Sequence, residues 1–218
     1  MKIRILLVDD HRMMRDGLRA ILAARPAFQI VGEADHGRAA IEAAGKLKPD
    51  VIVMDVGMPD MNGIEATKRI LAESPGIKVI ALSTHSDKRY VLNMMTAGAC
   101  GYVLKEAAAD DLVRAVDAAH RGEHYLSPQV TGVALEPMLG QLPRRGPGSS
   151  YRLLGARERE VLQLLAEGRT SKAIAEKLGL SIKTIETHRR NIGQKLGIKS
   201  IAELTKYAVR EGITSLEQ

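Results

Sequence analysis

The chain has 218 residues, of which 45% are hydrophobic and 27% charged, as in soluble globular proteins of one or two domains. It has no apolar run near the roughly 18 residues of a membrane span, no apolar leader of signal-peptide length, and one cysteine, Cys100, which excludes an intrachain disulfide and favours a reducing cytoplasm. The net charge of +6 comes mostly from residues 151–218, which hold 13 Lys and Arg against 8 Asp and Glu, so that part has either a nucleic-acid partner or a solvated basic surface.

Residues 1–122 alternate between short β-branched runs and amphipathic stretches. The spacing predicts strands over 3–8, 28–32, 51–54, 77–82 and 101–104, and helices over 12–24, 37–48, 63–73, 86–97 and 109–121. Four of the strands are nearly continuous apolar runs, as expected of strands covered on both faces. We therefore predict an α/β fold with a flavodoxin-like, doubly wound parallel sheet of five strands in the order 2-1-3-4-5.

Residues 123–150 interrupt this alternation with four prolines and several glycines and serines, and they are predicted to form a linker between domains at 1–122 and 151–218. The second domain is predicted to be small and all-α, with four helices over 156–167, 171–178, 182–196 and 200–211. Three glycines are placed to end helices and two hydroxyl residues to begin them: Gly168, Gly179, Gly197, Thr170 and Ser181.

Polar side chains stand where the predicted strands of the first domain end. They are Asp9 and Asp10 after the first strand, Asp55 after the third, Ser83 after the fourth and Lys105 after the fifth. Because the carboxyl ends of parallel strands line the ligand crevice of an open sheet, these groups are expected to meet at one edge. A lone aspartate after a strand is usually a helix cap, but polar groups at four strand ends together favour a shared site.

Three carboxylates in one place repel one another and favour a hard divalent cation with oxygen ligands, of which Mg²⁺ suits a small open site. Asp55 is central in that arrangement, and we expect it to act as a nucleophile that forms an acyl phosphate. Lys105 can balance charge on the phosphoryl oxygens, and Ser83 can donate a hydrogen bond to them.

Residues 1–122 resemble the receiver domain of bacterial response regulators. The resemblance rests on Val8-Asp9-Asp10-His11, Met54-Asp55-Val56-Gly57-Met58-Pro59, Asn62-Gly63, Leu82-Ser83-Thr84 and Tyr102-Val103-Leu104-Lys105. It implies phosphorylation of Asp55 by a histidine kinase or a phosphotransfer protein. It also implies Mg²⁺ held by Asp10, Asp55 and the backbone carbonyl of Gly57, with Asp9 in support. Finally, it implies that Ser83 and Tyr102 form a switch pair.

A helical wheel divides residues 182–196 into two faces. One face gathers Ile182, Ile185, Ile192 and Leu196, which are expected to pack against neighbouring helices; the other gathers Lys183, Thr187, Arg190 and Gln194, with Glu186 on the flank. Arg190 can read guanine, Glu186 can accept from cytosine, and Thr187 can touch a thymine methyl group or a phosphate. With the short helix before it, this pattern fits a helix-turn-helix whose second helix enters the DNA major groove, but by itself it fits a solvent-exposed amphipathic helix as well.

Residues 154–208 look like a LuxR-type helix-turn-helix of the NarL/FixJ class, on segments that include Lys183-Thr184-Ile185, Thr187-His188-Arg189 and Lys195-Leu196-Gly197. The resemblance implies sequence-specific DNA binding as a dimer, with helix 200–211 as a dimer contact. The expected DNA-binding residues are Lys183, Thr184, Glu186, Thr187, His188, Arg189 and Arg190. Three features depart from the family pattern: Gly155-Ala156 replaces Thr-Pro, Glu186 stands where lysine is common, and Gly193 lies inside the recognition helix. Close approach to a neighbouring helix is one explanation of Gly193.

These patterns predict a cytoplasmic, non-enzymatic transcription regulator of a two-component system. Phosphate on Asp55 would favour one of two receiver conformations, and so free the DNA-binding domain or pair two chains as an active homodimer. One alternative is a DNA-binding regulator with a phosphate-independent, receiver-like docking domain, against which the intact set of site residues argues. The other is an aspartyl-phosphate phosphohydrolase, which the glycine at position 57, where such enzymes carry a second aspartate, disfavours.

Overall fold

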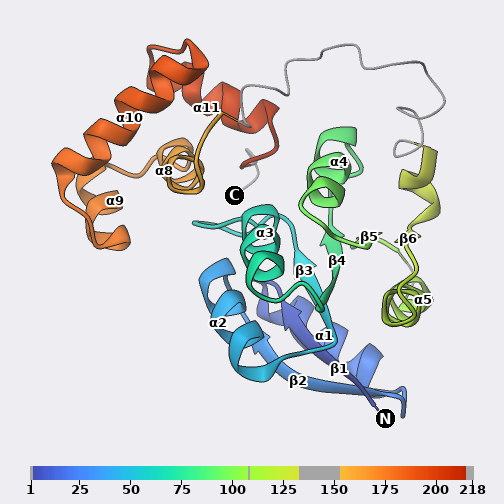
Figure 1. Cartoon of the computed structure of the whole chain (residues 1–218). Helices are drawn as coiled ribbons and strands as arrows, with labels where there is room; N and C mark the ends of the chain where they lie inside the picture. Colours follow the sequence, from blue (N-terminus) through green and yellow to red (C-terminus); the bar gives the residue numbers. More distant parts are fainter. Residues whose placement is uncertain (1, 108, 133–152, 215–218) are drawn as a thin grey trace. The chain divides into compact units, whose positions relative to one another are not determined.

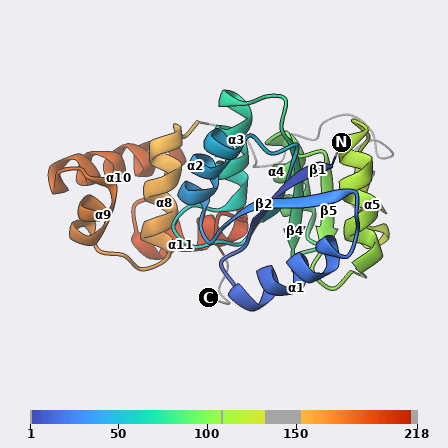
Figure 2. The same ribbon diagram turned by 90° about the horizontal axis from the view of Figure 1, so that it is seen from below.

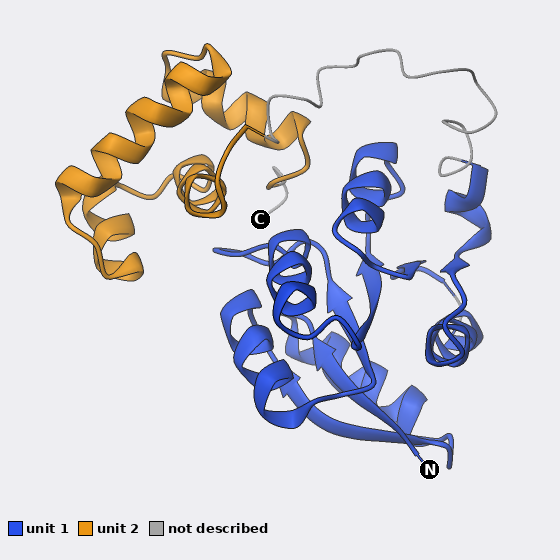
Figure 3. Cartoon of the chain, in the orientation of Figure 1, with its two compact units in different colours: residues 1–140 blue, residues 141–218 orange. Residues whose placement is uncertain are grey.

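The computed structural model describes residues 2–107, 109–132 and 153–214 (Figure 1). The chain divides into two compact units, Met1–Gly140 and Gln141–Gln218, which Figure 3 colours separately. The strands of the first unit are β1 (Ile3–Val8), β2 (Phe28–Ala34), β3 (Val51–Asp55), β4 (Lys78–Ser83), β5 (Gly101–Leu104) and β6 (Tyr125–Leu126). Its helices are α1 (Arg12–Ala23), α2 (Gly37–Leu47), α3 (Gly63–Glu73), α4 (Lys88–Thr96) and α5 (Ala109–His120).

The strands form one sheet in the order β2-β1-β3-β4-β5-β6, and every neighbouring pair is parallel. The predicted order 2-1-3-4-5 is therefore confirmed, with β6 as an addition. Helices cover both faces, as seen from below in Figure 2. One core cluster joins the sheet to α2, α3 and α4, and a second joins it to α1 and α5. Cover on both faces explains why the strand sequences are almost continuously apolar.

The sixth strand lies in the segment predicted to be a linker. The N–H of Tyr125 donates to Cys100 O (3.0 Å), and the N–H of Ser127 donates to Tyr102 O (2.9 Å). Two paired residues are too few to produce a recognisable strand pattern in the sequence. The predicted linker 123–150 thus begins with residues that belong to the sheet, and its part from 133 onward lies outside the described residues.

The second unit consists of α8 (Ala156–Ala166), α9 (Ser171–Leu178), α10 (Ile182–Leu196) and α11 (Ile201–Arg210). Thr170 and Ser181 cap α9 and α10 by accepting from the N–H groups of Ala173 (3.2 Å) and Thr184 (3.1 Å). The predicted stops Gly168, Gly179 and Gly197 all have positive φ angles, of 79°, 64° and 68°. The predicted all-α domain is confirmed. No helix in the described part of the chain is both long and apolar enough to cross a membrane.

The wheel prediction for α10 is right for its centre and wrong for its first residue. Ile185 and Ile192 are fully buried in the core of the unit, and Leu196 packs against that core. Ile182, in contrast, is 50% exposed. A wheel gives the direction of a side chain but not the extent of the helices beside it, and burial requires both.

Candidate functional site

The carboxyl ends of β1 and β3 and the residue after β5 meet in one polar pocket. Lys105 Nζ lies 2.8 Å from Asp9 Oδ2 and 2.9 Å from Asp55 Oδ2, so one ammonium bridges carboxylates from two other strands. Asp9 and Asp55 are almost completely buried, with exposed fractions of 0% and 3%. The structure therefore brings together three of the residues that the sequence predicts to share a site.

Burial and charge shift the acid–base behaviour of this pocket. Burial and then repulsion from Asp9 raise the pKa of Asp55 to about 6, against the opposing effect of Lys105. Burial alone would lower the pKa of Lys105, but the two carboxylates raise it above its ordinary value. Lys105 is therefore a cation at neutral pH, whereas burial and repulsion from Asp9 disfavour the ionised form of Asp55.

The residues at this edge have the donor set that Mg²⁺ prefers. Ligand atoms of Asp9, Asp10, His11 and Asp55 all lie within 4.8 Å of one another. Asp10 Oδ1 is buried and has no hydrogen-bond donor among the described residues, although His11 Nδ1 lies 3.0 Å away. A buried carboxylate oxygen without a donor beside two further carboxylates fits a hard divalent cation.

The predicted switch residues meet at the backbone of His85. Ser83 Oγ accepts from the N–H of His85 (3.0 Å), and the hydroxyl of Tyr102 donates to the carbonyl of the same residue (2.7 Å). Tyr102 is fully buried, and the His85 ring stacks on Tyr90 with centroids 4.3 Å apart. Ser83 and Tyr102 are thus linked through one residue, in an arrangement that holds the tyrosine inside the unit.

An apolar groove of about 390 Å³ opens beside the carboxylate pocket. It is lined by α1 and by residues at the end of β5 and the start of α5. Met13 on its rim is 87% exposed, and both His11 and Lys105 border it. The groove is therefore an apolar surface that borders Lys105, the residue in contact with Asp55.

In the second unit, α10 presents a polar face to solvent. Lys183, Thr187, Arg190 and Gln194 are exposed, as the wheel predicts. Three further residues predicted to bind DNA, Thr184, His188 and Arg189, are only partly exposed. Thr184 Oγ1 lies 2.8 Å from Ser181 Oγ, so its hydroxyl already takes part in the helix cap.

The structure gives Glu186 an additional role. Its Oε1 accepts from Ser171 Oγ at the start of α9 (2.5 Å) and lies 3.4 Å from an Arg189 nitrogen. This carboxylate therefore connects the two helices of the motif. The contact explains how an acidic residue can stand where the family pattern commonly has lysine.

Both units match known families. Residues 5–117 match the response regulator receiver domain family, and residues 152–208 match the luxR family of bacterial regulatory proteins. The transcriptional regulatory protein LiaR of Bacillus subtilis (strain 168) is 40% identical over 98% of this chain and 100% of its own length. This chain is a response regulator of the NarL/FixJ class.

Other relatives of this response regulator are similar over their whole length. Response regulator GacA of Pseudomonas aeruginosa is 37% identical over 97% of this chain and 97% of its own. The structure of the RcsB response regulator in complex with DNA has a TM-score of 0.61 and 28% identity, and covers 97% of this chain. A LuxR family response regulator from Aurantimonas sp. SI85-9A1 is 32% identical with a TM-score of 0.61, over 64% of this chain.

The predicted function class is confirmed: the response regulator is a DNA-binding transcription factor of a two-component system with a phosphorylatable receiver. Its family consists of transcriptional regulators, which also confirms the prediction of a non-enzymatic protein over that of a phosphohydrolase.

Arg15 donates to the carbonyl of Asp9 in this response regulator (2.7 Å), and it is not among the site residues predicted from the sequence. The signal was present, because Arg15 shares a helix face with Leu18 and Leu22, both of which are buried. An arginine at an i, i+3, i+7 position of an apolar face requires a polar partner, and here that partner is the turn of the candidate site.

Proposed function

We propose that Asp55 is the phosphoacceptor of this response regulator and that phosphate on it controls DNA binding through α10. The supporting observation is the position of Lys105 between Asp9 and Asp55, at 2.8 and 2.9 Å. This contact unites side chains from three strands around one acceptor carboxylate. A cation beside the acceptor is what phosphoryl transfer requires, because the transition state spreads negative charge over the phosphoryl oxygens.

The donor in this proposal is a phosphohistidine on a histidine kinase or a phosphotransfer protein, docked in the groove bordered by Met13. An oxygen of Asp55 attacks the phosphorus, the O–P bond forms as the N–P bond breaks, and the histidine nitrogen leaves with its electron pair. Lys105 then balances part of the charge on the phosphoryl group. Mg²⁺, held by Asp10, Asp55 and the carbonyl of Gly57 with Asp9 in support, would supply further charge neutralisation.

Ser83 and Tyr102 would transmit the change. If the phosphoryl group attracts the Ser83 hydroxyl, the N–H of His85 loses its acceptor and the segment that also holds the Tyr102 hydroxyl is free to move. Phosphate then favours whichever receiver conformation allows this exchange of hydrogen bonds, in proportion to the difference in stability.

The DNA-binding part of the proposal places α10 in the major groove, in a homodimer that works in the cytoplasm. The exposed Lys183, Thr187 and Arg190 would contact phosphates and base edges. Glu186, Thr184, His188 and Arg189 would flank that contact and orient it. The exposed Ile201 at the start of α11 supports this helix as a dimer contact.

The proposal is tested by phosphorylating the full chain with acetyl phosphate and locating the phosphate by mass spectrometry. We expect Asp55→Asn and chelation of divalent cations each to abolish uptake, and Asp35→Asn, on an exposed residue outside the pocket, to leave it unchanged. Met13→Glu should reduce uptake from a phosphohistidine protein but not from acetyl phosphate. Undiminished uptake by the Asp55→Asn variant would contradict the assignment.

A further inference from the structure

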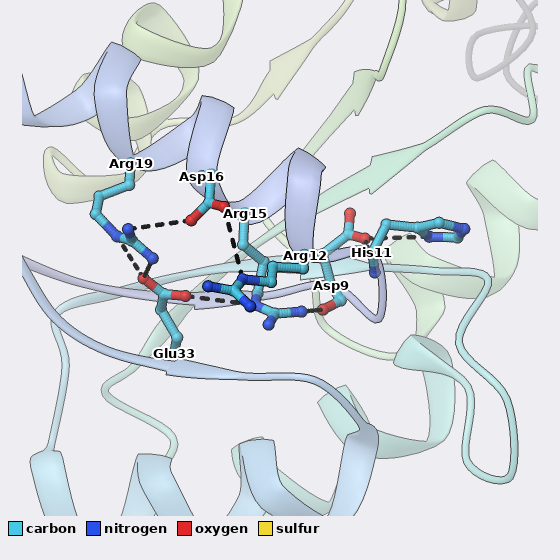
Figure 4. A network of polar contacts seen from close by, with 7 residues as sticks. All are labelled: Asp9, His11, Arg12, Arg15, Asp16, Arg19 and Glu33. Atoms are coloured by element: carbon cyan, nitrogen blue, oxygen red, sulfur yellow. Dashed lines mark hydrogen bonds and ion pairs between the residues drawn. The ribbon is translucent and has the colours of Figure 1, made fainter.

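A charged cluster of Arg15, Asp16, Arg19 and Glu33 lies against the turn between β1 and α1 that carries Asp9 (Figure 4). Glu33 of β2 stands at its centre and accepts from two arginines of α1. Arg15 Nε donates to Glu33 Oε2 (3.3 Å), and Arg19 Nε donates to Glu33 Oε1 (2.6 Å). Arg19 also lies 3.1 Å from Asp16 Oδ1.

The two arginines differ in what else they reach. The Arg15 side chain is only 15% exposed, and its Nη1 donates to the carbonyl oxygen of Asp9 at 2.7 Å. The Arg19 side chain is 47% exposed, and its contacts go to Glu33 and Asp16. Of these two arginines, Arg15 is therefore the one that connects the cluster to the turn that carries the predicted metal ligands.

The carbonyl that Arg15 holds belongs to the peptide between Asp9 and Asp10. Because a peptide unit is planar, a contact that holds its oxygen also restricts where the N–H and the Cα of Asp10 can lie. The same turn is held from two other directions, since the N–H of Asp9 donates to Ala34 O (3.2 Å) and Asp9 Oδ1 accepts from the N–H of His11 (2.9 Å). Arg15 adds a contact at the point where the chain leaves the sheet.

We infer that Arg15, oriented by Glu33, is a positioning residue that holds the Asp9–Asp10 peptide so that both carboxylates keep the geometry needed for Mg²⁺ binding and phosphoryl transfer. This inference rests on the proposed function. The Arg15–Glu33 pair has no net charge, and Arg15→Lys preserves that charge, so an effect of Arg15→Lys on Mg²⁺ binding reports orientation rather than charge. A guanidinium has N–H donors in several fixed directions and serves Glu33 and the carbonyl at once, which a lysine ammonium on a flexible stem does not.

The first test measures Mg²⁺ binding to the full chain by titration calorimetry, in the absence of any phosphodonor. Second-layer partners of metal ligands commonly change affinity by 10-fold or more, and we expect Arg15→Met and Arg15→Lys to weaken Mg²⁺ binding by about 10-fold. Arg19→Met, which removes the other arginine on Glu33 and leaves the turn untouched, should bind Mg²⁺ as the wild type does. Arg15→Lys keeps the charge and the apolar stem, so it decides the question if Arg15→Met does not fold.

The second test follows phosphate uptake from acetyl phosphate against Mg²⁺ concentration. A positioning role predicts that Arg15→Lys raises the half-saturating Mg²⁺ concentration by about 10-fold and leaves most of the maximal rate at saturation. A purely structural role would lower the fraction of active protein without moving that concentration.

Wild-type Mg²⁺ affinity in both Arg15 variants overturns the inference, as does an equal loss of affinity in Arg19→Met. Failure of the proposed function has a different signature. In that case wild type and Asp55→Asn take up phosphate equally, while calorimetry still shows whether Arg15 affects the metal site.

Discussion

At the scale of single residues, the carboxylate of Asp55 carries an unfavourable charge. Burial and repulsion from Asp9 raise its pKa to about 6, compared with an ordinary value of 3.8. The stability contributed by protonated Asp55 is therefore fully present below pH 3.8 and is lost as the pH rises to about 6. At neutral pH the ionised group lowers the free energy of unfolding, even with Lys105 beside it.

It follows that Asp55→Asn should stabilise the metal-free protein at neutral pH, by on the order of 1–2 kcal/mol, because it removes the repelled charge. The gain should shrink as the pH is lowered toward 4, where wild-type Asp55 is itself protonated. Urea denaturation of both proteins in a chelating buffer measures the difference. Lower stability of the variant at neutral pH would show that the attraction of Lys105 outweighs the other two effects.

The exposed residues of α10 give a second prediction at this scale. Arg190→Ala should cost about 1–3 kcal/mol of binding to a preferred DNA sequence and relax the preference at one base position. Lys183→Ala should weaken binding to all sequences similarly. It should also reduce the slope of log affinity against log salt concentration by about one. Selection from a random DNA pool, followed by affinity measurements at several salt concentrations, distinguishes base reading from phosphate contact. Equal loss on all sequences for Arg190→Ala would remove it from the base-reading set.

At the scale of elements, the end of α10 shows why a glycine occupies the interior of a recognition helix. A Cβ at Gly193 would lie 2.7 Å from the carbonyl oxygen of Ile198, whose N–H donates to the carbonyl of Gly193 (2.9 Å). The close neighbour is thus the chain that turns back after Gly197, rather than a separate helix. The closing turn of α10 requires a residue without a side chain at this position.

Gly193→Ala should therefore destabilise the second unit, although alanine is favoured over glycine in a helix by about 1 kcal/mol, because overpacking against backbone costs about 1–3 kcal/mol. Gly45→Ala in α2 is the matched control, since a Cβ there meets nothing within 4 Å. It should raise stability by up to about 1 kcal/mol. Denaturant midpoints of the two variants should move in opposite directions, and a stabilising Gly193→Ala would show that the turn relaxes easily.

At the scale of the whole molecule, each unit has a core of its own. Two clusters cover the faces of the sheet in the first unit, and a third joins α8, α9, α10 and α11 in the second. Ligands of one unit should accordingly stabilise that unit through its own folding equilibrium.

Calorimetric melting of the full chain should show two transitions. A concentration of Mg²⁺ 100-fold above its dissociation constant should raise the stability of the first unit by about 2.7 kcal/mol, and DNA should raise only the midpoint of the second. With Asp10→Asn, the Mg²⁺ effect should fall, since the variant removes a proposed ligand. A single transition that responds to both ligands would show that the two units unfold as one.

The sequence by itself determined the order of the elements, the parallel sheet and the meeting of Asp9, Asp55 and Lys105. A strand that is buried on both faces can be recognised from its own run of apolar residues, whatever its neighbours are. Parallel strands then bring their carboxyl ends to one edge of the sheet. Other features depend on how elements meet in space, and only the tertiary structure decided them. Examples are the pairing of β6, the exposure of Ile182, the contact of Glu186 with Ser171, and Arg15 on the carbonyl of Asp9. The local sequence pattern indicates which face of an element is apolar, whereas contacts of this kind depend on where the neighbouring elements end.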